Sequence, residues 1–309
     1  MGSVLVTQNI NSKNITNFSH NFIENKIYAF MSDNKQNTKE LFNFFSNKSI
    51  KYHGKIFLNG NNIKKSKVKE SICFIGADYE FVGTKSINSI LRYMKRSYPK
   101  WDKILALSLL EQAKLNPKSR FSRLSKNQKN ILISIITFAS CADITIFEEP
   151  FEYCNAKLRY QLFTEIYQHH IKHKRCLIIS TDRLNEITRY IDKMIFLNHG
   201  SILETFTPTY VDNNFIVLTG KKEVLISLLK NKTLKGQPIG LEELETIKDD
   251  EKEQELSAYL AANYQKDDIR LCQKYEIQTS KIPLDKLFIF LTLIKEKKNQ
   301  ENKELALSK

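Results

Sequence analysis

The sequence predicts an α/β protein whose core is a mostly parallel sheet. Short, apolar, β-branched segments alternate with longer segments of helical periodicity, which is the pattern of βαβ units. The three clearest apolar segments span residues 143–148, 176–181 and 193–198. Because strands joined through helices run parallel, we expect a parallel core sheet with an antiparallel segment near the N-terminus.

The first quarter of the chain is expected to supply strands and one helix. The strands are predicted at residues 4–7, 26–31, 55–58 and 71–76. A loop over residues 32–37 should lead into a helix from about Thr38 to Ser46. The apolar side of that helix carries Leu41, Phe42, Phe44 and Phe45.

Helices dominate the middle of the chain. Apolar spacing predicts them at about 86–96, 103–114 and 126–140, and Asp102 is placed to cap the second. The next segment, 143–150, ends in Glu148, Glu149 and Pro150, which indicates a buried strand whose tip presents two carboxylates. The predicted elements that follow are a helix at 156–172, a strand at 176–181, a short helix at 183–190, and strands at 193–198 and 201–204.

The character of the sequence changes after Phe206, and we place a domain boundary near 205–212. Beyond it we predict a strand at 215–219, a helix at 223–230, an acid-rich stretch at 235–255, and helices at 256–264 and 284–295. Residues 297–309 lack a core pattern and are expected to form a frayed, solvated tail.

Composition narrows the class of protein. The 309 residues carry a net charge of +14, with lysines spread along the whole chain. Basic and aromatic residues are not interleaved in the way that stacks bases, so nucleic-acid binding is not favoured. No apolar run approaches the roughly 18 residues that span a bilayer, and no signal sequence is evident, so we expect a cytosolic protein. The five cysteines are expected to be reduced core residues.

The order of these elements resembles the nucleotide-binding ATPase subunit of ATP-binding cassette (ABC) transporters. Leu124-Ser125-Lys126-Asn127-Gln128 stands where that family has the signature Leu-Ser-Gly-Gly-Gln, and the acidic strand follows at the interval of the Walker B strand. Residues 180–182 stand at the switch loop. The pair Trp101-Asp102 is similar to one in a bacterial exporter subgroup, and residues 283–292 resemble that subgroup's C-terminal extension.

The resemblance implies an ABC-ATPase fold: a P-loop NTPase-like core sheet, an N-terminal antiparallel part and a helical subdomain at about 77–140. We therefore divide the chain into an ABC-type nucleotide-binding domain, residues 1–206, and a small α+β accessory region, residues 207–309.

The phosphate loop departs from the family pattern G-x-x-x-x-G-K-[S/T]. The aligned residues, 32–39, read Ser-Asp-Asn-Lys-Gln-Asn-Thr-Lys, so both glycines are missing and Thr38 stands at the lysine position. Those glycines let the backbone curl so that N–H groups face the phosphates. Asn34 and Asn37 are expected to tolerate a left-handed conformation that would keep this shape. Lys39 is displaced by one position, a rotation of about 100° on a helix.

The other nucleotide contacts that the resemblance implies are also altered. Glu148 stands at the Walker B metal position in place of aspartate, and Glu149 stands at the catalytic carboxylate position. Asp182 replaces the switch histidine and would repel a γ-phosphate. In the signature, which the family offers to the ATP of the other subunit, Ser125 and Gln128 are kept while Lys126 and Asn127 replace the glycines.

These departures favour a degenerate subunit that binds ATP and Mg²⁺ at most weakly at its own site. It would pair with a second ABC ATPase subunit, whose ATP is a candidate ligand of the signature residues, and would couple to an integral-membrane permease at the inner face of the cell membrane. One alternative is a divergent but active ATPase in which Lys39 and Glu149 act on the nucleotide. Another is a regulatory or nucleic-acid-binding protein on the same fold.

Overall fold

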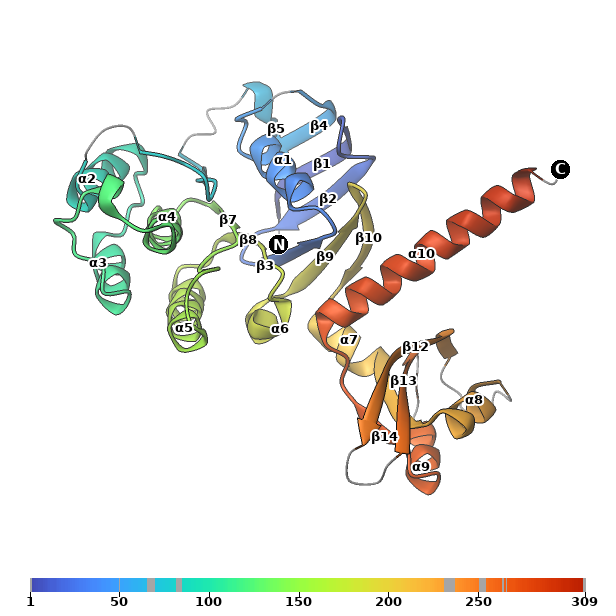
Figure 1. The fold of residues 1–309 in the computed structure, drawn as a ribbon. Helices are drawn as coiled ribbons and strands as arrows, with labels where there is room; N and C mark the ends of the chain where they lie inside the picture. The colour runs from blue at the N-terminus through green and yellow to red at the C-terminus, as the bar shows by residue number, and fades with distance from the viewer. Residues whose placement is uncertain are drawn as a thin grey trace. The chain divides into compact units, whose positions relative to one another are not determined.

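The computed structural model describes residues 2–49, 51–65, 70–81, 85–230, 237–249, 254–262, 264 and 266–307. The chain divides into two compact units, Met1–Thr205 and Phe206–Lys309. The first unit contains two sheets and the second contains one, and each unit has its own buried cluster (Figure 1).

An antiparallel sheet opens the first unit. Its strands are β1 (Ser3–Asn11), β2 (Phe18–Ile23), β4 (His53–Leu58) and β5 (Asn61–Asn62), in the order β2-β1-β4-β5. The sequence analysis missed β2 because its polar residues hide the alternation: Phe18 and Phe22 are fully buried, while Ser19 and Asn21 are exposed. The expected strand at 4–7 is the middle of the longer β1.

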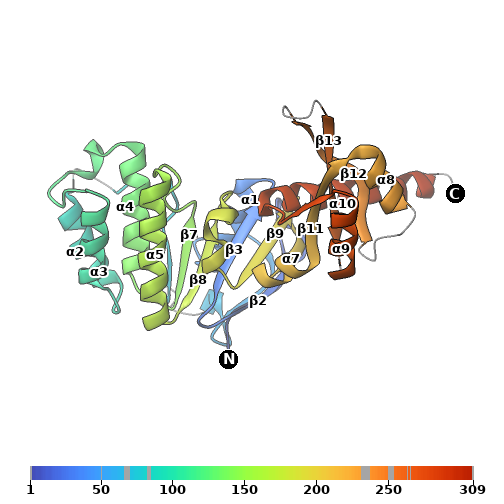
Figure 2. The ribbon, with the colours of Figure 1, turned by 90° about the horizontal axis from the view of Figure 1, so that it is seen from below.

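The second sheet is the core of the unit. It contains β3 (Ile27–Ser32), β6 (Ile72–Phe74), β7 (Ile144–Glu148), β8 (Cys176–Ser180), β9 (Lys193–Asn198) and β10 (Ser201–Phe206). Their order is β10-β9-β3-β8-β7-β6, and the neighbours from β9 to β6 pair in parallel (Figure 2). The predicted parallel core and N-terminal antiparallel sheet are both confirmed.

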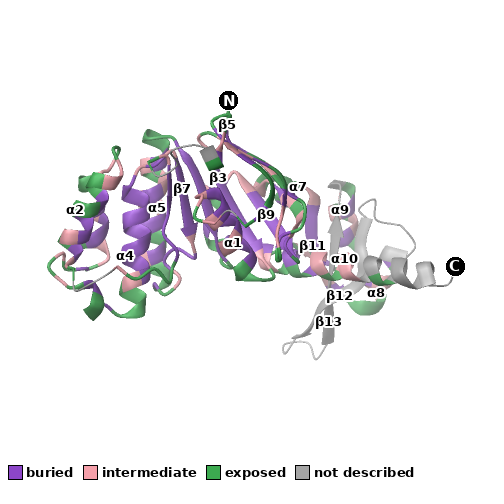
Figure 3. Cartoon of the chain, turned by 90° about the horizontal axis from the view of Figure 1, so that it is seen from above, coloured by how far each residue is buried: buried purple, intermediate pink, exposed green. Residues whose placement is uncertain are grey.

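Helix α1 (Lys35–Phe45) packs its apolar side into one continuous core with both sheets. Phe42 lies edge-on to Phe30 of β3, with ring centroids 5.6 Å apart, and Phe45 packs edge-on against Phe22 of β2 at 5.4 Å. Aromatic pairs of this geometry stabilise a core beyond the area that they bury. Strands β3, β6, β7, β8 and β9 of the core sheet are mostly buried, as Figure 3 shows in purple.

The remaining helices of the unit are α2 (Ile87–Ser97), α3 (Lys103–Gln112), α4 (Lys126–Ala139), α5 (Ala156–Lys172) and α6 (Leu184–Ile187), with a 3₁₀ turn at Thr188–Tyr190. Asp102 caps α3 as predicted, because its carboxylate accepts the N–H of Leu105 at 2.9 Å. Among the described residues, no helix is both long and apolar enough to cross a membrane.

The second unit has a four-stranded sheet, β12-β13-β11-β14, whose neighbouring strands pair antiparallel. Its elements are α7 (Pro208–Asn214), β11 (Phe215–Lys221), α8 (Lys222–Lys230), β12 (Gln237–Asp249), β13 (Gln254–Ala262), α9 (Lys266–Lys274), β14 (Gln278–Ser280) and α10 (Leu284–Leu307). Its buried cluster includes Leu218, Leu225 and Cys272.

Two predictions in this unit were wrong. The helix expected at 256–264 is strand β13, because its residues pair along their length with β11, from Phe215 opposite Ala262 to Lys221 opposite Leu256. Pairing of this extent overrides local helix preference. The frayed tail expected at 297–309 is helical to Leu307, since α10 continues from Leu284 without a break.

The turn between β9 and β10 gives a test of the fold. Gly200 has φ +71°, and a Cβ there would lie 1.8 Å from the carbonyl oxygen of Asn14. Gly60 has φ +78° but has nothing within 4 Å of the same position. We expect Gly200→Ala to lose about 3 kcal/mol of unfolding free energy, and the matched control Gly60→Ala about 1 kcal/mol, measured by urea denaturation. Equal losses would show that the close approach at Gly200 is not a constraint.

Candidate functional site

The candidate site lies at the carboxyl ends of three adjacent parallel strands. Ser32 of β3, Glu148 of β7 and Ser180 of β8 end their strands at the same edge of the core sheet. In open α/β sheets this edge is where ligands bind. The chain leaves it through the segment before α1, through Glu149 after β7, and through Asp182 after β8.

The segment that aligns with the phosphate loop is much shorter than predicted. Only Asp33 and Asn34 separate β3 from α1, which begins at Lys35 rather than near Thr38. Asn34 is the N-cap: its backbone is extended, with φ −138° and ψ 113°, and its side chain accepts the N–H of Gln36 at 2.9 Å. Asn37 lies inside the helix and is buried. The expectation that these two asparagines take a left-handed conformation is therefore wrong.

Backbone amides on both sides of Lys35 already have acceptors within the protein. The N–H of Asp33 donates to the carbonyl of Leu197 at 3.3 Å, and that of Asn34 donates to the Ser32 hydroxyl at 3.2 Å. The N–H of Asn37 donates to the carbonyl of Asn34 at 3.0 Å. A phosphate loop works through successive N–H groups that point into one concavity. These amides point instead at the loop's own oxygens and at β9.

Lys35, in the first turn of α1, joins the carboxylates that surround the site. Its ammonium Nζ lies 2.7 Å from Oδ2 of Asp182, 3.2 Å from Oε1 of Glu149 and 3.7 Å from Oε1 of Glu152. We call these four residues the Lys35 cluster. One positive charge facing three carboxylates leaves a formal charge of −2 when all are ionised. The catalytic and switch positions are thus brought together, but around a lysine of the same chain.

Burial and the charges of neighbouring residues both shift the pKa values of Glu149 and Lys35. Burial raises the pKa of Glu149, the charge of Asp182 raises it further, and Lys35 only partly offsets both. For Lys35, partial burial lowers the pKa, but the hydrogen bond to Asp182 and the charge of Glu149 outweigh burial and raise it. Lys35 is therefore cationic near neutral pH and holds a carboxylate that is only 8% exposed.

A second set of contacts occupies the Walker B metal position and the displaced lysine. Oε2 of Glu148 accepts the N–H of Ala77 at 2.8 Å, and Nζ of Lys39 pairs with Oδ2 of Asp78 at 2.7 Å. Thr38, at the family's lysine position, is buried and donates its hydroxyl to the carbonyl of Lys35 at 2.8 Å. Within the described part of the chain, no three His, Cys, Asp or Glu residues converge as metal ligands.

The two kept residues of the signature have a local structural role. Ser125 caps α4 and accepts the N–H of Gln128 at 3.2 Å, while the Gln128 side chain accepts the N–H of Ser125 at 3.0 Å. This reciprocal capping box needs these two residue types at this spacing. Lys126 lies over the ring of Tyr153, 5.0 Å from its centroid, and Asn127 is exposed.

The sequence identified the carboxylates of the site, but not Lys35, the cation that pairs with them. Lys35 was one residue of a predicted loop, and Glu152 was not singled out. The sequence contains only an indirect indication of this lysine. Glu148, Glu149 and Asp182 were expected at one edge of the sheet, and no cation was assigned to pair with them. Lys35 and its carboxylate partners are more than a hundred positions apart in the sequence. They meet because β3 pairs in parallel with β8, and that pairing cannot be read from the sequence.

Removing the lysine should destabilise the protein in a pH-dependent way. The folded-state pKa of Glu149 is raised above its ordinary value of 4.5, so this carboxyl opposes folding as the pH rises past 4.5. Lys35→Met enlarges that effect, because the carboxylates lose their counter-charge. Since Lys35 is half exposed, we expect a loss of about 1–2 kcal/mol of unfolding free energy at pH 7.5 and under about 0.5 kcal/mol at pH 4, by urea denaturation.

The matched control for this measurement is Lys281→Met. Lys281 pairs with Asp212 at 2.6 Å, but both side chains are largely exposed. We expect this control to change stability by less than about 0.5 kcal/mol at both pH values. A loss in Lys35→Met that is the same at pH 4 and pH 7.5 would contradict the electrostatic account of the cluster.

Comparison with known proteins identifies the fold. No protein-family model matches the chain. The ABC transporter ATP-binding protein YtrB of Bacillus subtilis (strain 168) is 24% identical over 150 residues, which are 48% of this chain and 51% of YtrB. The chain thus spans about half the length of this curated relative.

Solved structures extend the match to the architecture. The ATP-binding subunit of an ABC transporter superposes with a TM-score of 0.60 at 16% identity, over 66% of this chain and 90% of that one. The bacterial ABC transporter cassette MJ0796, solved as a dimer, gives 0.56 at 12% identity, over 66% and 98%. The chain has the ABC-ATPase fold that its sequence predicts, and it is similar to ATP-binding subunits of ABC transporters.

Proposed function

We propose that this chain is a non-hydrolysing ABC subunit that pairs with a competent ATPase subunit and couples it to a membrane permease. One observation carries the proposal: the Lys35 ammonium bridges the carboxylates at the catalytic and switch positions. In this arrangement Glu149 serves as the buried partner of a lysine rather than as a base that orients water.

The charge balance of the site argues against a triphosphate there. A nucleotide that entered would have to displace Lys35, which would leave Glu149, Glu152 and Asp182 facing the phosphates without their cation. Like charges at this range cost several kcal/mol in a partly buried site. Phosphoryl transfer depends on positioned donors and cations, and the donors of this loop are already satisfied within the chain.

The metal position supports the same conclusion. Glu148 would have to release the amide of Ala77 before it could ligate Mg²⁺, and Lys39 would have to leave Asp78 to reach a phosphate. Each release leaves a polar group without its partner. These residues do not fit Mg²⁺ and ATP, so we assign no catalytic step to Glu148, Glu149, Asp182 or Lys39.

A role toward a partner's nucleotide would fall to the N-terminus of α4. We propose that Ser125, Lys126, Asn127 and Gln128 form this contact, because the start of a helix favours anions and Lys126 adds a cation. The capping box restricts that role, since the N–H of Ser125 already donates to Gln128. Any contribution therefore comes from the later amides of the first turn and from Lys126.

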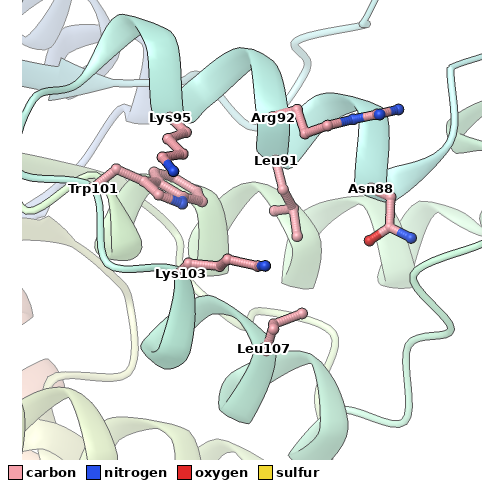
Figure 4. Close-up of a pocket in the computed structure, with 7 residues that line it drawn as sticks. All are labelled: Asn88, Leu91, Arg92, Lys95, Trp101, Lys103 and Leu107. Carbon is pink, nitrogen blue, oxygen red and sulfur yellow. The ribbon is translucent and has the colours of Figure 1, made fainter.

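The surface between α2 and α3 is suited to the proposed permease. A cavity of about 370 Å³ opens there, lined by Asn88, Leu91, Arg92, Lys95, Trp101, Lys103 and Leu107 (Figure 4). Ile104 of α3 is 83% exposed, so apolar residues lie on the exposed face of this helix as well as on its buried face. Exposed apolar side chains beside a cavity are typical of surfaces that bind another protein. We propose that a permease segment covers it, which places the chain at the inner face of the membrane.

Nucleotide binding tests the proposal directly. We expect a fluorescent ATP analogue with Mg²⁺ to show no saturable binding to the isolated chain below about 1 mM, since few favourable contacts are free. Saturable binding with micromolar affinity, competed by unlabelled ATP, would contradict the proposal and favour the divergent-ATPase alternative. The same titration with a competent ABC ATPase subunit serves as the positive control.

Partner recovery tests the second half of the proposal. A tagged full-length chain, purified from its native cells in mild detergent, should bring down an ABC ATPase subunit with intact motifs together with an integral-membrane protein. The variant Trp101→Ala combined with Lys95→Glu should reduce recovery of the membrane protein by about tenfold, because it removes a tryptophan, a residue type that anchors interfaces, and reverses a charge at the cavity. The control Lys281→Glu should leave recovery unchanged. Recovery of neither partner by the unmodified chain would refute this role.

A further inference from the structure

The net charge of the chain is concentrated in the part of the fold between β6 and β7. Residues 85–126, which include α2 and α3, carry eleven lysines and arginines but only two acidic residues, Asp102 and Glu111, so their net charge is +9. Residues 127–309 carry 26 basic and 26 acidic residues and are neutral overall. Lysines occur along the whole chain, but most of its +14 excess therefore belongs to residues 85–126.

The eleven basic residues of this region are all exposed, and most have no anionic partner. Lys100 is paired with Asp143, and Lys85 and Lys126 lie over tyrosine rings. The carboxylate of Asp102 is occupied in capping α3. Among the residues that the structure describes, no ion pair involves the other eight cations, which we call the basic surface: Arg92, Lys95, Arg96, Lys103, Lys114, Lys118, Arg120 and Arg123.

The segments that carry the basic surface are joined to one another. The N–H of Ile87, at the start of α2, donates to the carbonyl oxygen of Ser119 at 2.9 Å. The N–H of Leu115 donates to the carbonyl oxygen of Leu110, near the end of α3, at 2.9 Å. Segment 114–123 is therefore held against both helices, and the cations of all three lie on adjoining parts of the fold.

Anions are absent from the part of the basic surface around the cavity between α2 and α3. Figure 4 shows Arg92 and Lys95 on α2 and Lys103 on α3, and none of the 7 residues that line the cavity is acidic. Like charges gathered on one side of a protein repel one another and destabilise the compact state unless anions lie against them. The basic surface is thus suited to a partner that presents many negative charges over a wide area.

A membrane that contains anionic phospholipids has this property. Its headgroups move within the bilayer, so they can match cations that are spread over several segments, and its negative potential attracts lysine and arginine close to the surface. Tyr93, the exposed aromatic residue of 85–126, is a type found at the level of the headgroups. Nucleic acid is less suited, because stacking of successive bases needs several exposed aromatic rings, and Nζ of Lys85 already lies over this one.

We propose that the basic surface binds anionic phospholipid headgroups directly. This contact goes beyond the proposed function, in which a permease alone attaches the chain to the membrane, and it belongs to the isolated chain. A permease segment seated in the cavity leaves Arg96 and the cations of segment 114–123 to face the headgroups, since none of them lines the cavity.

Vesicle flotation with the purified full-length chain tests the proposal. The vesicles are phosphatidylcholine alone or phosphatidylcholine with about 30% phosphatidylglycerol, in about 0.1 M NaCl. We expect binding to the anionic vesicles to be at least about tenfold tighter than to the neutral ones. Raising NaCl to about 0.5 M should remove most of this difference, because the screening length falls to roughly 4 Å.

Charge reversal outside the cavity locates the contact. The triple variant Arg96→Glu, Lys118→Glu and Arg120→Glu changes three exposed members of the basic surface that a permease seated in the cavity does not need. We expect it to bind the anionic vesicles at least about tenfold more weakly than the unmodified chain. Its urea midpoint should stay close to that of the unmodified chain, because all three positions are exposed.

The matched control is the triple variant Lys13→Glu, Lys51→Glu and Lys55→Glu. These three lysines are exposed and lie on or beside β1 and β4, so the control changes the net charge equally and leaves the basic surface intact. We expect it to weaken binding to the anionic vesicles by less than about threefold, since distant charges are screened.

Three results would overturn the proposal. The first is equal binding to neutral and anionic vesicles, a comparison that uses the unmodified chain and decides even where a variant does not fold. The second is an equal loss of binding in the two triple variants, which would mean that net charge alone acts. The third is tighter binding to a short DNA duplex or to polyglutamate than to the anionic vesicles at equal concentration of negative charge.

Discussion

The contact on which the candidate site depends is the ion-pair cluster of Lys35. Its ammonium group reaches three carboxylates on two segments, Glu149 and Glu152 after β7 and Asp182 after β8. Carboxylates gathered at the ends of parallel strands repel one another unless a cation lies among them. In this chain the cation is covalently part of α1. The connection from β3 to α1 is only two residues long, and Lys35 is the first residue of that helix.

The remaining features of the site are consistent with this internal neutralisation. Asp33 accepts the N–H of His199 at 2.9 Å, which ties the short connection to the turn after β9. Asn34 caps α1, and the carboxylate of Glu148 accepts the N–H of Ala77. Polar groups that would face a ligand in an open site are thus hydrogen-bonded within the fold, where they stabilise it. The capping box likewise gives Ser125 and Gln128 a role in the stability of α4.

Most of the architecture could be predicted from the sequence because the core strands and long helices have strong periodicity. Segments 156–172 and 193–198 were predicted with their observed ends, and Asp102 was identified as a cap. Two of the failures share a physical cause: long-range pairing decided the outcome. Strand β13 forms because β11 lies beside it, and β2 forms because Phe18 and Phe22 reach the core of α1. The positions of Glu149 and Asp182 could be predicted, whereas the partner Lys35 could not, because its contacts depend on where α1 starts.

The central claim is that Lys35 occupies the place where a triphosphate would have to lie. The most direct measurement is a crystal structure of the chain grown with millimolar ATP and Mg²⁺. The account predicts that Nζ of Lys35 stays within salt-bridge distance of Glu149 and Asp182, with no nucleotide between the end of β3 and the start of α1. A triphosphate bound there, with Lys35 turned away from Asp182 and the first turn of α1 unwound, would contradict it.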